Sequence, residues 1–423
     1  MDSNLATVPI GLTAGDFFLA RQPILDRDQG LFAYELLFRN ASSGAADVTN
    51  DSLATATVLA NLIELGMQTV VGSALAFVNV DMAVLSSDYV RFLAPDQVVL
   101  EILETVEITP ALLARVSELA KLGFKFALDD VIAASDPIRQ LLPSVDIIKV
   151  DIRAMSSAAL ATLAVELKRS GKKLLAEKVE TRAEFEHCLS LGFDYFQGYY
   201  FAKPDIMRGK KLSPSQLGIV RLMALIQRDA DSAEIERMIK QDAALGLNLL
   251  RLVNSPGAGT VHRIESLGQA LMILGRLQLQ RWLTILLYSE PRQGGRLTSP
   301  LLVMAATRGK LLELIALKHK PKDRQAAERA FTVGIMSLME ALVGVSMTTM
   351  LEQIPVVDEI RDALLLQTGR FGDMLTLAEL LEQVSENGPR LSELMTSFDL
   401  TTDEVTQLQL QAFAWSDAIA NQA

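Results

Sequence analysis

The chain has 423 residues, a formal net charge of −11 and a single cysteine. Its length predicts two or three domains, because a single hydrophobic core rarely grows beyond roughly 250–300 residues. The acidic balance argues against sequence-independent binding of nucleic acid, which needs clustered cations facing phosphates. One cysteine cannot form an intrachain disulfide, and no apolar run is long enough to cross a membrane. We therefore expect a cytoplasmic protein that binds neither nucleic acid nor membrane.

Residues 16–204 alternate short apolar runs with longer amphipathic stretches. The short runs are rich in β-branched and aromatic residues, whereas segments such as Pro110–Lys121 and Ser156–Ser170 have helical spacing. This alternation is typical of βαβ units around a parallel sheet. We predict a modified (β/α)8 barrel of the TIM type with an irregular start, because no helix separates its first two strands. The predicted strands are Phe17–Ala20, Leu31–Phe38, Ala76–Val80, Val98–Ile102, Lys125–Leu128, Ile147–Val150, Lys173–Ala176 and Tyr195–Phe196.

The pattern changes after the last predicted strand. A polar segment follows, and from there to the C-terminus the spacing is helical, with no convincing strand. Thr401 and Glu404 have the spacing of a capping box, which predicts the start of the last helix. The predicted organisation is therefore a barrel over 1–204, a linker over 205–216 and an all-α domain over 217–423.

Each predicted strand after the first carries a charged or amide side chain at or near its C-terminal end. In a barrel these ends converge on one face, which is where barrel active sites are built. A single carboxylate in an apolar strand could equally well belong to a structural ion pair or to a functional site. The same feature on successive strands indicates a shared site. The residues are Glu35, Asn79, Glu101, Glu104, Asp129, Asp130, Lys149, Asp151, Glu177, Glu180 and Gln197.

The composition of this set indicates a metal site. Several carboxylates converging around one lysine would repel one another unless cations were present. Carboxylate and amide oxygens favour Mg²⁺ or Mn²⁺ over zinc, and the three histidines of the chain lie far apart in the sequence. A pair of such ions roughly 3.5–4 Å apart polarises a phosphoryl group and activates water near neutral pH. The pattern predicts metal-dependent phosphoester chemistry.

Motifs in the first half resemble the EAL domain family. The stretch Tyr34-Glu35-Leu36-Leu37-Phe38-Arg39 is similar to the signature that gives the family its name, with Glu-Leu-Leu in place of Glu-Ala-Leu. The resemblance implies a barrel that binds the bacterial messenger cyclic di-GMP and usually hydrolyses it to pGpG. The other matching motifs are Gln22-Pro23-Ile24, Phe77-Val78-Asn79-Val80, Leu100-Glu101-Ile102-Leu103-Glu104, Leu128-Asp129-Asp130, Ile148-Lys149-Val150-Asp151, Ala176-Glu177-Lys178-Val179-Glu180-Thr181 and Gln197-Gly198-Tyr199-Tyr200-Phe201-Ala202-Lys203-Pro204.

The resemblance also implies a role for each site residue, with two Mg²⁺ or Mn²⁺ ions. Lys149 would help to place the attacking water, and Glu177 would be the candidate base. Glu104 and Glu180 would support the site. The remaining roles are ligands of the first metal for Glu35, Asn79, Glu101 and Asp129, ligands of the second metal for Asp130 and Asp151, and contacts to the substrate for Gln22, Arg39 and Gln197.

The loop after the fifth strand departs from the family pattern. Active members usually carry Asp-Asp-Phe-Gly-Thr-Gly-Tyr-Ser-Ser, whereas this chain has Asp-Asp-Val-Ile-Ala-Ala-Ser-Asp-Pro over 129–137. Leu103 and Lys178 also replace a usual Thr and a usual Gly. In the family this loop couples dimerisation to metal binding, so a homodimer is compatible with the resemblance. Because alanine disfavours backbone angles that glycine permits, we expect the second metal to bind more weakly than the first.

The helical half resembles the HDOD domain, which is similar to an HD phosphohydrolase without its metal ligands. The resemblance lies in 239–245, 249–255 and 264–275, and the chain contains no His-Asp pair. We therefore expect this half to be non-catalytic and to contact a protein partner. Two hypotheses stay open. The protein is either a cyclic di-GMP phosphodiesterase, or a module that binds cyclic di-GMP or a protein and passes its state to the helical half.

Overall fold

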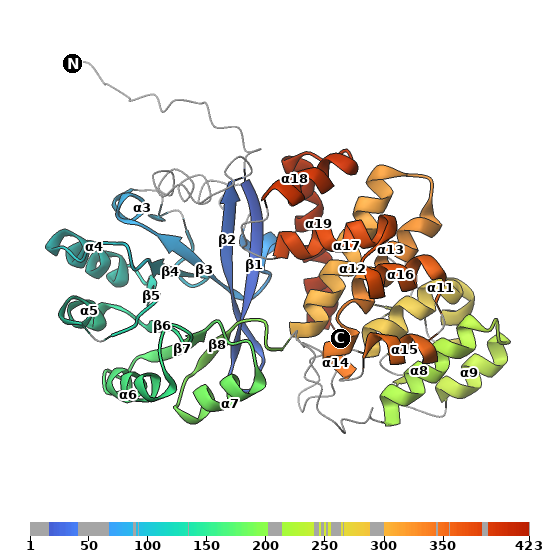
Figure 1. Cartoon of the computed structure of the whole chain (residues 1–423), viewed down its shortest axis with the longest axis horizontal. Helices are drawn as coiled ribbons and strands as arrows, with labels where there is room; N and C mark the ends of the chain where they lie inside the picture. Colours follow the sequence, from blue (N-terminus) through green and yellow to red (C-terminus); the bar gives the residue numbers. More distant parts are fainter. Residues whose placement is uncertain are drawn as a thin grey trace, which may run out of the picture.

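The computed structural model places two bodies side by side, a barrel from the N-terminal half and a cluster of helices from the C-terminal half (Figure 1). The residues that it describes are 17–40, 67–87, 90–91, 93–133, 135–201, 214–240, 245–246, 249–250, 253–254, 264, 266–287, 300–343, 346–354, 356–382 and 388–422.

The N-terminal half is a closed eight-stranded barrel with the strands in chain order. Strand β1 (Phe17–Asp26) pairs antiparallel with both β2 (Leu31–Asn40) and β8 (Tyr195–Gln197), and all other neighbouring pairs are parallel. The prediction of a barrel with an irregular start is confirmed. Strand β1 continues to Asp26 rather than ending at Ala20, because it keeps its pairing with β2 through the polar residues that interrupt the apolar run.

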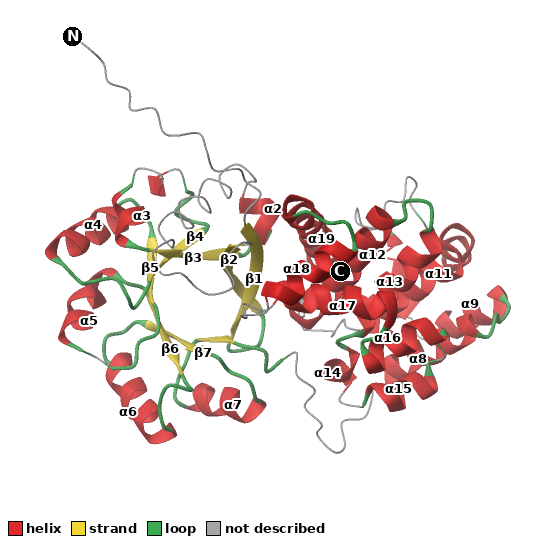
Figure 2. Ribbon diagram, turned by 45° about the horizontal axis from the view of Figure 1, so that its top comes forward, coloured by secondary structure: helices red, strands yellow, loops and turns green. Residues whose placement is uncertain are grey.

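The remaining barrel strands lie close to their predicted bounds. They are β3 (Leu75–Val80), β4 (Val98–Ile102), β5 (Lys125–Leu128), β6 (Ile147–Asp151) and β7 (Lys173–Glu177). Figure 2 shows the barrel helices arranged around the outside of the sheet. These are α2 (Met67–Val71), α3 (Met82–Ser86), α4 (Pro110–Lys121), α5 (Asp136–Leu141) with a 3-10 turn over Leu142–Ser144, α6 (Ser157–Lys168) and α7 (Arg182–Ser190).

The described part of the C-terminal half contains only helices, as predicted. Helix α11 is interrupted at Gly275, and hydrogen bonds between Thr401 and Glu404 confirm the capping box. The helices are α8 (Pro214–Gln227), α9 (Ser232–Lys240), α11 (Leu267–Leu287), α12 (Pro300–His319), α13 (Arg324–Met336), α14 (Met339–Val343), α15 (Met347–Gln353), α16 (Asp358–Leu366), α17 (Gly369–Glu382), α18 (Gly388–Ser397) and α19 (Thr402–Gln422).

The segment predicted as a linker, 205–216, overlaps the first turn of α8, which begins at Pro214. Residues 205–213 lie outside the described part of the chain, as do 241–244, 251–252, 255 and 265 among the residues that carry the HDOD resemblance. Among the described helices, none combines the length and the apolarity that a membrane crossing requires.

The two halves meet along β1, the strand that pairs with both β2 and β8. Helices α17 and α19 contact this strand, and α19 also contacts α2. Leu410 and Phe413 of α19 are buried in the same apolar cluster as Tyr34 and Leu36 of β2. The last helix of the chain therefore completes the outer packing layer of the barrel.

Candidate active site

The site residues lie one layer above the apolar side chains that fill the barrel interior. Successive strand residues point to opposite faces, so residues two apart share a face. The barrel interior is filled by a cluster that includes Ala33, Phe77, Val99, Ala127, Ile147 and Leu175, with Tyr195 packed against it. Two residues further along each strand lie, in the same order, Glu35, Asn79, Glu101, Asp129, Lys149, Glu177 and Gln197. The strand period therefore brings the predicted set together at the C-terminal ends of the parallel strands.

Lys149 lies at the centre of the carboxylates and is 1% exposed. Its Nζ lies 3.0 Å from Asp129 Oδ1, 3.0 Å from Glu177 Oε1 and 3.4 Å from Glu35 Oε2. It also contacts the fully buried Glu101. One ammonium group therefore faces four carboxylates, which leaves excess negative charge in a space with little water.

Two amide side chains orient the carboxylate of Glu35. Gln197 Nε2 donates to Glu35 Oε2 at 2.5 Å and to Gln22 Oε1 at 2.8 Å. Asn79 Nδ2 lies at 3.5 Å from Glu35 Oε1. These contacts join β1, β2, β3 and β8, so the predicted substrate residues Gln22 and Gln197 lie beside the predicted metal ligands.

Asp130 and Asp151 lie at the mouth of the site together with Lys178. Lys178 Nζ lies 2.5 Å from Asp151 Oδ2 and 3.9 Å from Asp130 Oδ1. The backbone N–H of Arg153 donates to Asp151 Oδ1 at 2.8 Å. In the sequence Lys178 stands out only as a departure from the family pattern, and Arg153 does not stand out at all, because neither contact follows from strand periodicity.

Burial and crowding shift the pKa values of these groups. Burial raises the pKa of Glu177 to about 8, and burial with the neighbouring Glu35 raises the pKa of Glu101 well above its usual value. Burial disfavours charged Lys149, but the surrounding carboxylates outweigh burial and raise its pKa. Burial also acts on Asp129, but Lys149 outweighs it and lowers that pKa. The raised pKa values of Glu101 and Glu177 mean that these two groups tend to hold a proton when no cation is bound, and a divalent cation would favour their charged forms.

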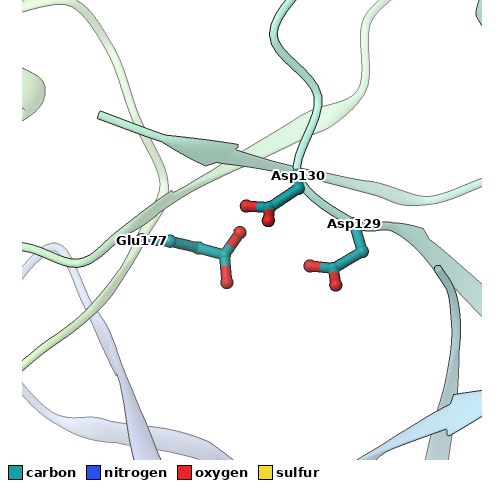
Figure 3. Close-up of side chains that lie close together, drawn as sticks. All are labelled: Asp129, Asp130 and Glu177. Carbon is teal, nitrogen blue, oxygen red and sulfur yellow. The ribbon is translucent and has the colours of Figure 1, made fainter. Parts of the chain in front are cut away.

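The donor set fits a divalent cation. Asp129, Asp130 and Glu177 each offer a carboxylate oxygen within 4.8 Å of the others, and their carboxylates converge (Figure 3). Within the described residues, several buried oxygens of the site accept no hydrogen bond, and an ion would satisfy them. They are Asn79 Oδ1, Asp130 Oδ1, Glu177 Oε2 and Gln197 Oε1.

The other predicted residues lie at the rim. Glu180 pairs with Arg153, with 2.8 Å between Oε2 and Nη2, and Glu104 is exposed beyond the end of β4. Arg39 lies in β2, where its backbone is opposite Phe18, and its side chain is outside the described part of the structure. Its role in binding the nucleotide stays a prediction. In the altered loop Val131 is buried and Ile132 is 64% exposed, and α5 begins at Asp136.

Comparison with known families assigns a domain to each half of the chain. Residues 6–204 match the EAL domain family, and residues 215–358 match the HDOD domain family. Among solved structures, an EAL domain protein from Listeria monocytogenes EGD-e is similar, with a TM-score of 0.37 and 22% identity over 44% of this chain and 87% of that one.

Two curated relatives are similar over nearly the whole chain. The protein YuxH of Bacillus subtilis (strain 168) is 31% identical over 405 residues, which cover 94% of this chain and 97% of YuxH. The cyclic di-GMP phosphodiesterase CdgJ of Vibrio cholerae serotype O1 is 32% identical over 407 residues, which cover 95% of this chain and 93% of CdgJ. The chain belongs to the EAL family of proteins, and its EAL domain is followed by an HDOD domain.

Proposed function

We propose that this protein hydrolyses cyclic di-GMP to linear pGpG, with Mg²⁺ or Mn²⁺ bound at the C-terminal face of the barrel. The observation that carries the proposal is the ring of carboxylates around Lys149, a charge-crowded arrangement that has a clear use only with bound cations. The relative named as a cyclic di-GMP phosphodiesterase, 32% identical over 95% of this chain, supports the choice of substrate.

The proposed first metal is held by the deeper acidic and amide groups, and the second by the two aspartates at the mouth. Bound divalent ions would supply Lewis-acid polarisation of a phosphoryl oxygen. Glu177 has an oxygen without a donor beside Lys149, which suits it to take the proton of the attacking water. The proposed ligands are Glu35, Asn79, Glu101 and Asp129 for the first ion, and Asp130 and Asp151 for the second.

The protein's own residues also position the substrate in this proposal. Gln197 and Gln22 are hydrogen-bonded to each other beside Glu35, and they would contact the nucleotide together with Arg39. Lys149, held by its carboxylates, would orient the attacking water next to Glu177. The helical domain, proposed to span 217–423 after the linker, would regulate the barrel and bind a protein partner.

The test is hydrolysis by the full-length protein, with cyclic di-GMP, Mn²⁺ or Mg²⁺, and chromatography for pGpG. Glu35→Ala and Asn79→Ala should abolish pGpG formation, because each removes a proposed metal ligand. Glu186→Gln is the matched control, since this carboxylate is exposed on α7 and pairs only with Arg182 among the described contacts. Near-normal turnover by either site variant at saturating metal would overturn the proposal.

The second candidate is a binding module that senses cyclic di-GMP without hydrolysing it. The observation in its favour is Lys178, which already neutralises part of the acidic mouth. This candidate predicts saturable binding of cyclic di-GMP in calorimetry and no pGpG at any Mn²⁺ concentration.

A further inference from the structure

A second ammonium group, that of Lys178, enters the site from the solvent side. Its side chain is 53% exposed, in contrast to the buried Lys149. Its Nζ lies 2.5 Å from Asp151 Oδ2 and 3.9 Å from Asp130 Oδ1, and so bridges a carboxylate at the end of β6 and one in the loop after β5. Lys178 therefore occupies a cation position between them.

The backbone at Lys178 holds the side chain in this position. Its φ is +57°, in the left-handed region where a side chain is disfavoured relative to glycine. Hydrogen bonds hold the turn on both sides, since Arg153 Nε donates to the Lys178 carbonyl at 3.2 Å and the N–H of Val179 donates to the Gln197 carbonyl at 2.9 Å. The ion pairs offset part of the backbone strain, and they direct the ammonium across the mouth of the site.

We infer that Lys178 is a built-in counter-ion for Asp130 and Asp151, and that it competes with a second divalent ion for these carboxylates. The inference rests on the proposed function, which assigns both aspartates to the second ion. A divalent ion in that position would be repelled by the ammonium and would have to displace it. The three carboxylates proposed for the first ion are contacted by Lys149 and not by Lys178 in the described structure.

The consequence is stepwise loading of the site. One ion binds while Lys178 remains on Asp151, and a second binds only when the lysine swings out into solvent. This differs from the effect expected of the altered loop over 131–137, because here the second ion is weakened by charge rather than by backbone geometry. A change of one side chain is then sufficient to strengthen it.

The test measures Mn²⁺ binding to the full-length protein, by electron paramagnetic resonance and calorimetry without nucleotide. Lys178→Met removes the charge and keeps the length, whereas Lys178→Arg keeps the charge. Lys178→Gly also removes the charge, and glycine adopts the positive φ without strain. It serves as a second uncharged variant in case Lys178→Met does not fold. Lys173→Met is the matched control, because Lys173 is an exposed lysine at the start of β7 whose partner is Asp194.

We expect the wild type, Lys178→Arg and Lys173→Met to bind one Mn²⁺ tightly and a second weakly. Lys178→Met and Lys178→Gly should bind the second ion roughly tenfold more tightly or better, because a unit charge in direct contact has been removed. Equal affinities for both ions in the wild type, or no gain in either uncharged variant, would overturn the inference. Mn²⁺ binding as expected without any pGpG formation would overturn the proposed function and leave this inference standing.

Discussion

Arg21 of β1 and Asp417 of α19 form a two-bond ion pair that joins the barrel to the last helix. The Nη1–Oδ2 distance is 2.9 Å and the Nη2–Oδ1 distance is 3.1 Å, and the two side chains are 4% and 14% exposed. The guanidinium lies over the rings of Tyr34 and Phe413, at 4.4 Å and 4.0 Å from their centroids. Arg21 is adjacent to the site residue Gln22. Neighbouring residues of β1 therefore contact the helical half through Arg21 and the site through Gln22.

The first prediction is that Asp417→Asn destabilises the whole chain. It leaves the buried guanidinium without a charged partner, and loss of one partner of a buried pair costs about 3–5 kcal/mol. The measurement is the free energy of unfolding from urea denaturation. Asp373→Asn is a matched control, because Asp373 is half exposed and lies 3.7 Å from Arg390. A loss for Asp417→Asn no larger than that of the control would contradict a structural role for the pair.

The second prediction concerns the barrel without the helical half. Residues 1–204 alone would expose the apolar surface that Leu410 and Phe413 cover, and would remove the partner of Arg21. The hydrogen bond from Tyr199 Oη to the carbonyl of Glu382, 2.9 Å long, would also be lost. We expect this fragment to aggregate or to unfold at a markedly lower temperature than the full chain, measured by size-exclusion chromatography and thermal melting.

The control for this truncation is the full chain cut by a protease at a site inserted within 205–213. If the interface holds the halves together, both pieces elute as one species and melt near the temperature of the uncut protein. A monodisperse fragment of residues 1–204 that melts as the full chain does would show that the barrel is independent of α19.

The third prediction concerns Cys188, the single cysteine of the chain. It is fully buried in α7, and burial raises the pKa of its thiol to about 12. Because the thiolate is the nucleophile, the folded protein should react very slowly with a disulfide reagent near pH 8, where an ordinary cysteine of pKa about 8.5 is partly ionised. The check is the labelling rate with and without urea. Labelling of the native protein as fast as that of the unfolded chain would contradict this burial.

The layout of the site follows from strand periodicity to a large extent. An apolar residue two positions before each polar one, as in Val99 and Glu101, specifies both the filled interior and the ring above it, so this part could be read from the sequence. The ion pair between Arg21 and Asp417 could not, because its partners are 396 residues apart and no local pattern relates them. The position of Lys178 also escaped prediction, since it depends on a left-handed backbone at a residue that is not glycine.

The last prediction is that Gly198→Ala disrupts the substrate side of the site. Gly198 follows Gln197 with φ +143°, and a Cβ there would lie 2.0 Å from the carbonyl oxygen of Val179. The turn after β7 would have to move away from β8, and the hydrogen bond from Gln197 to Glu35 would move with it.

Gly171→Ala is the matched control, because its φ is +73° but a Cβ there meets nothing within 4 Å. The free energy of unfolding of the control should fall only by the cost of placing alanine in the left-handed region, about 1–2 kcal/mol. Gly198→Ala should lose clearly more stability in urea denaturation and bind cyclic di-GMP more weakly. Equal losses in the two variants, with unchanged nucleotide binding, would mean that the contact between Gly198 and Val179 does not position Gln197.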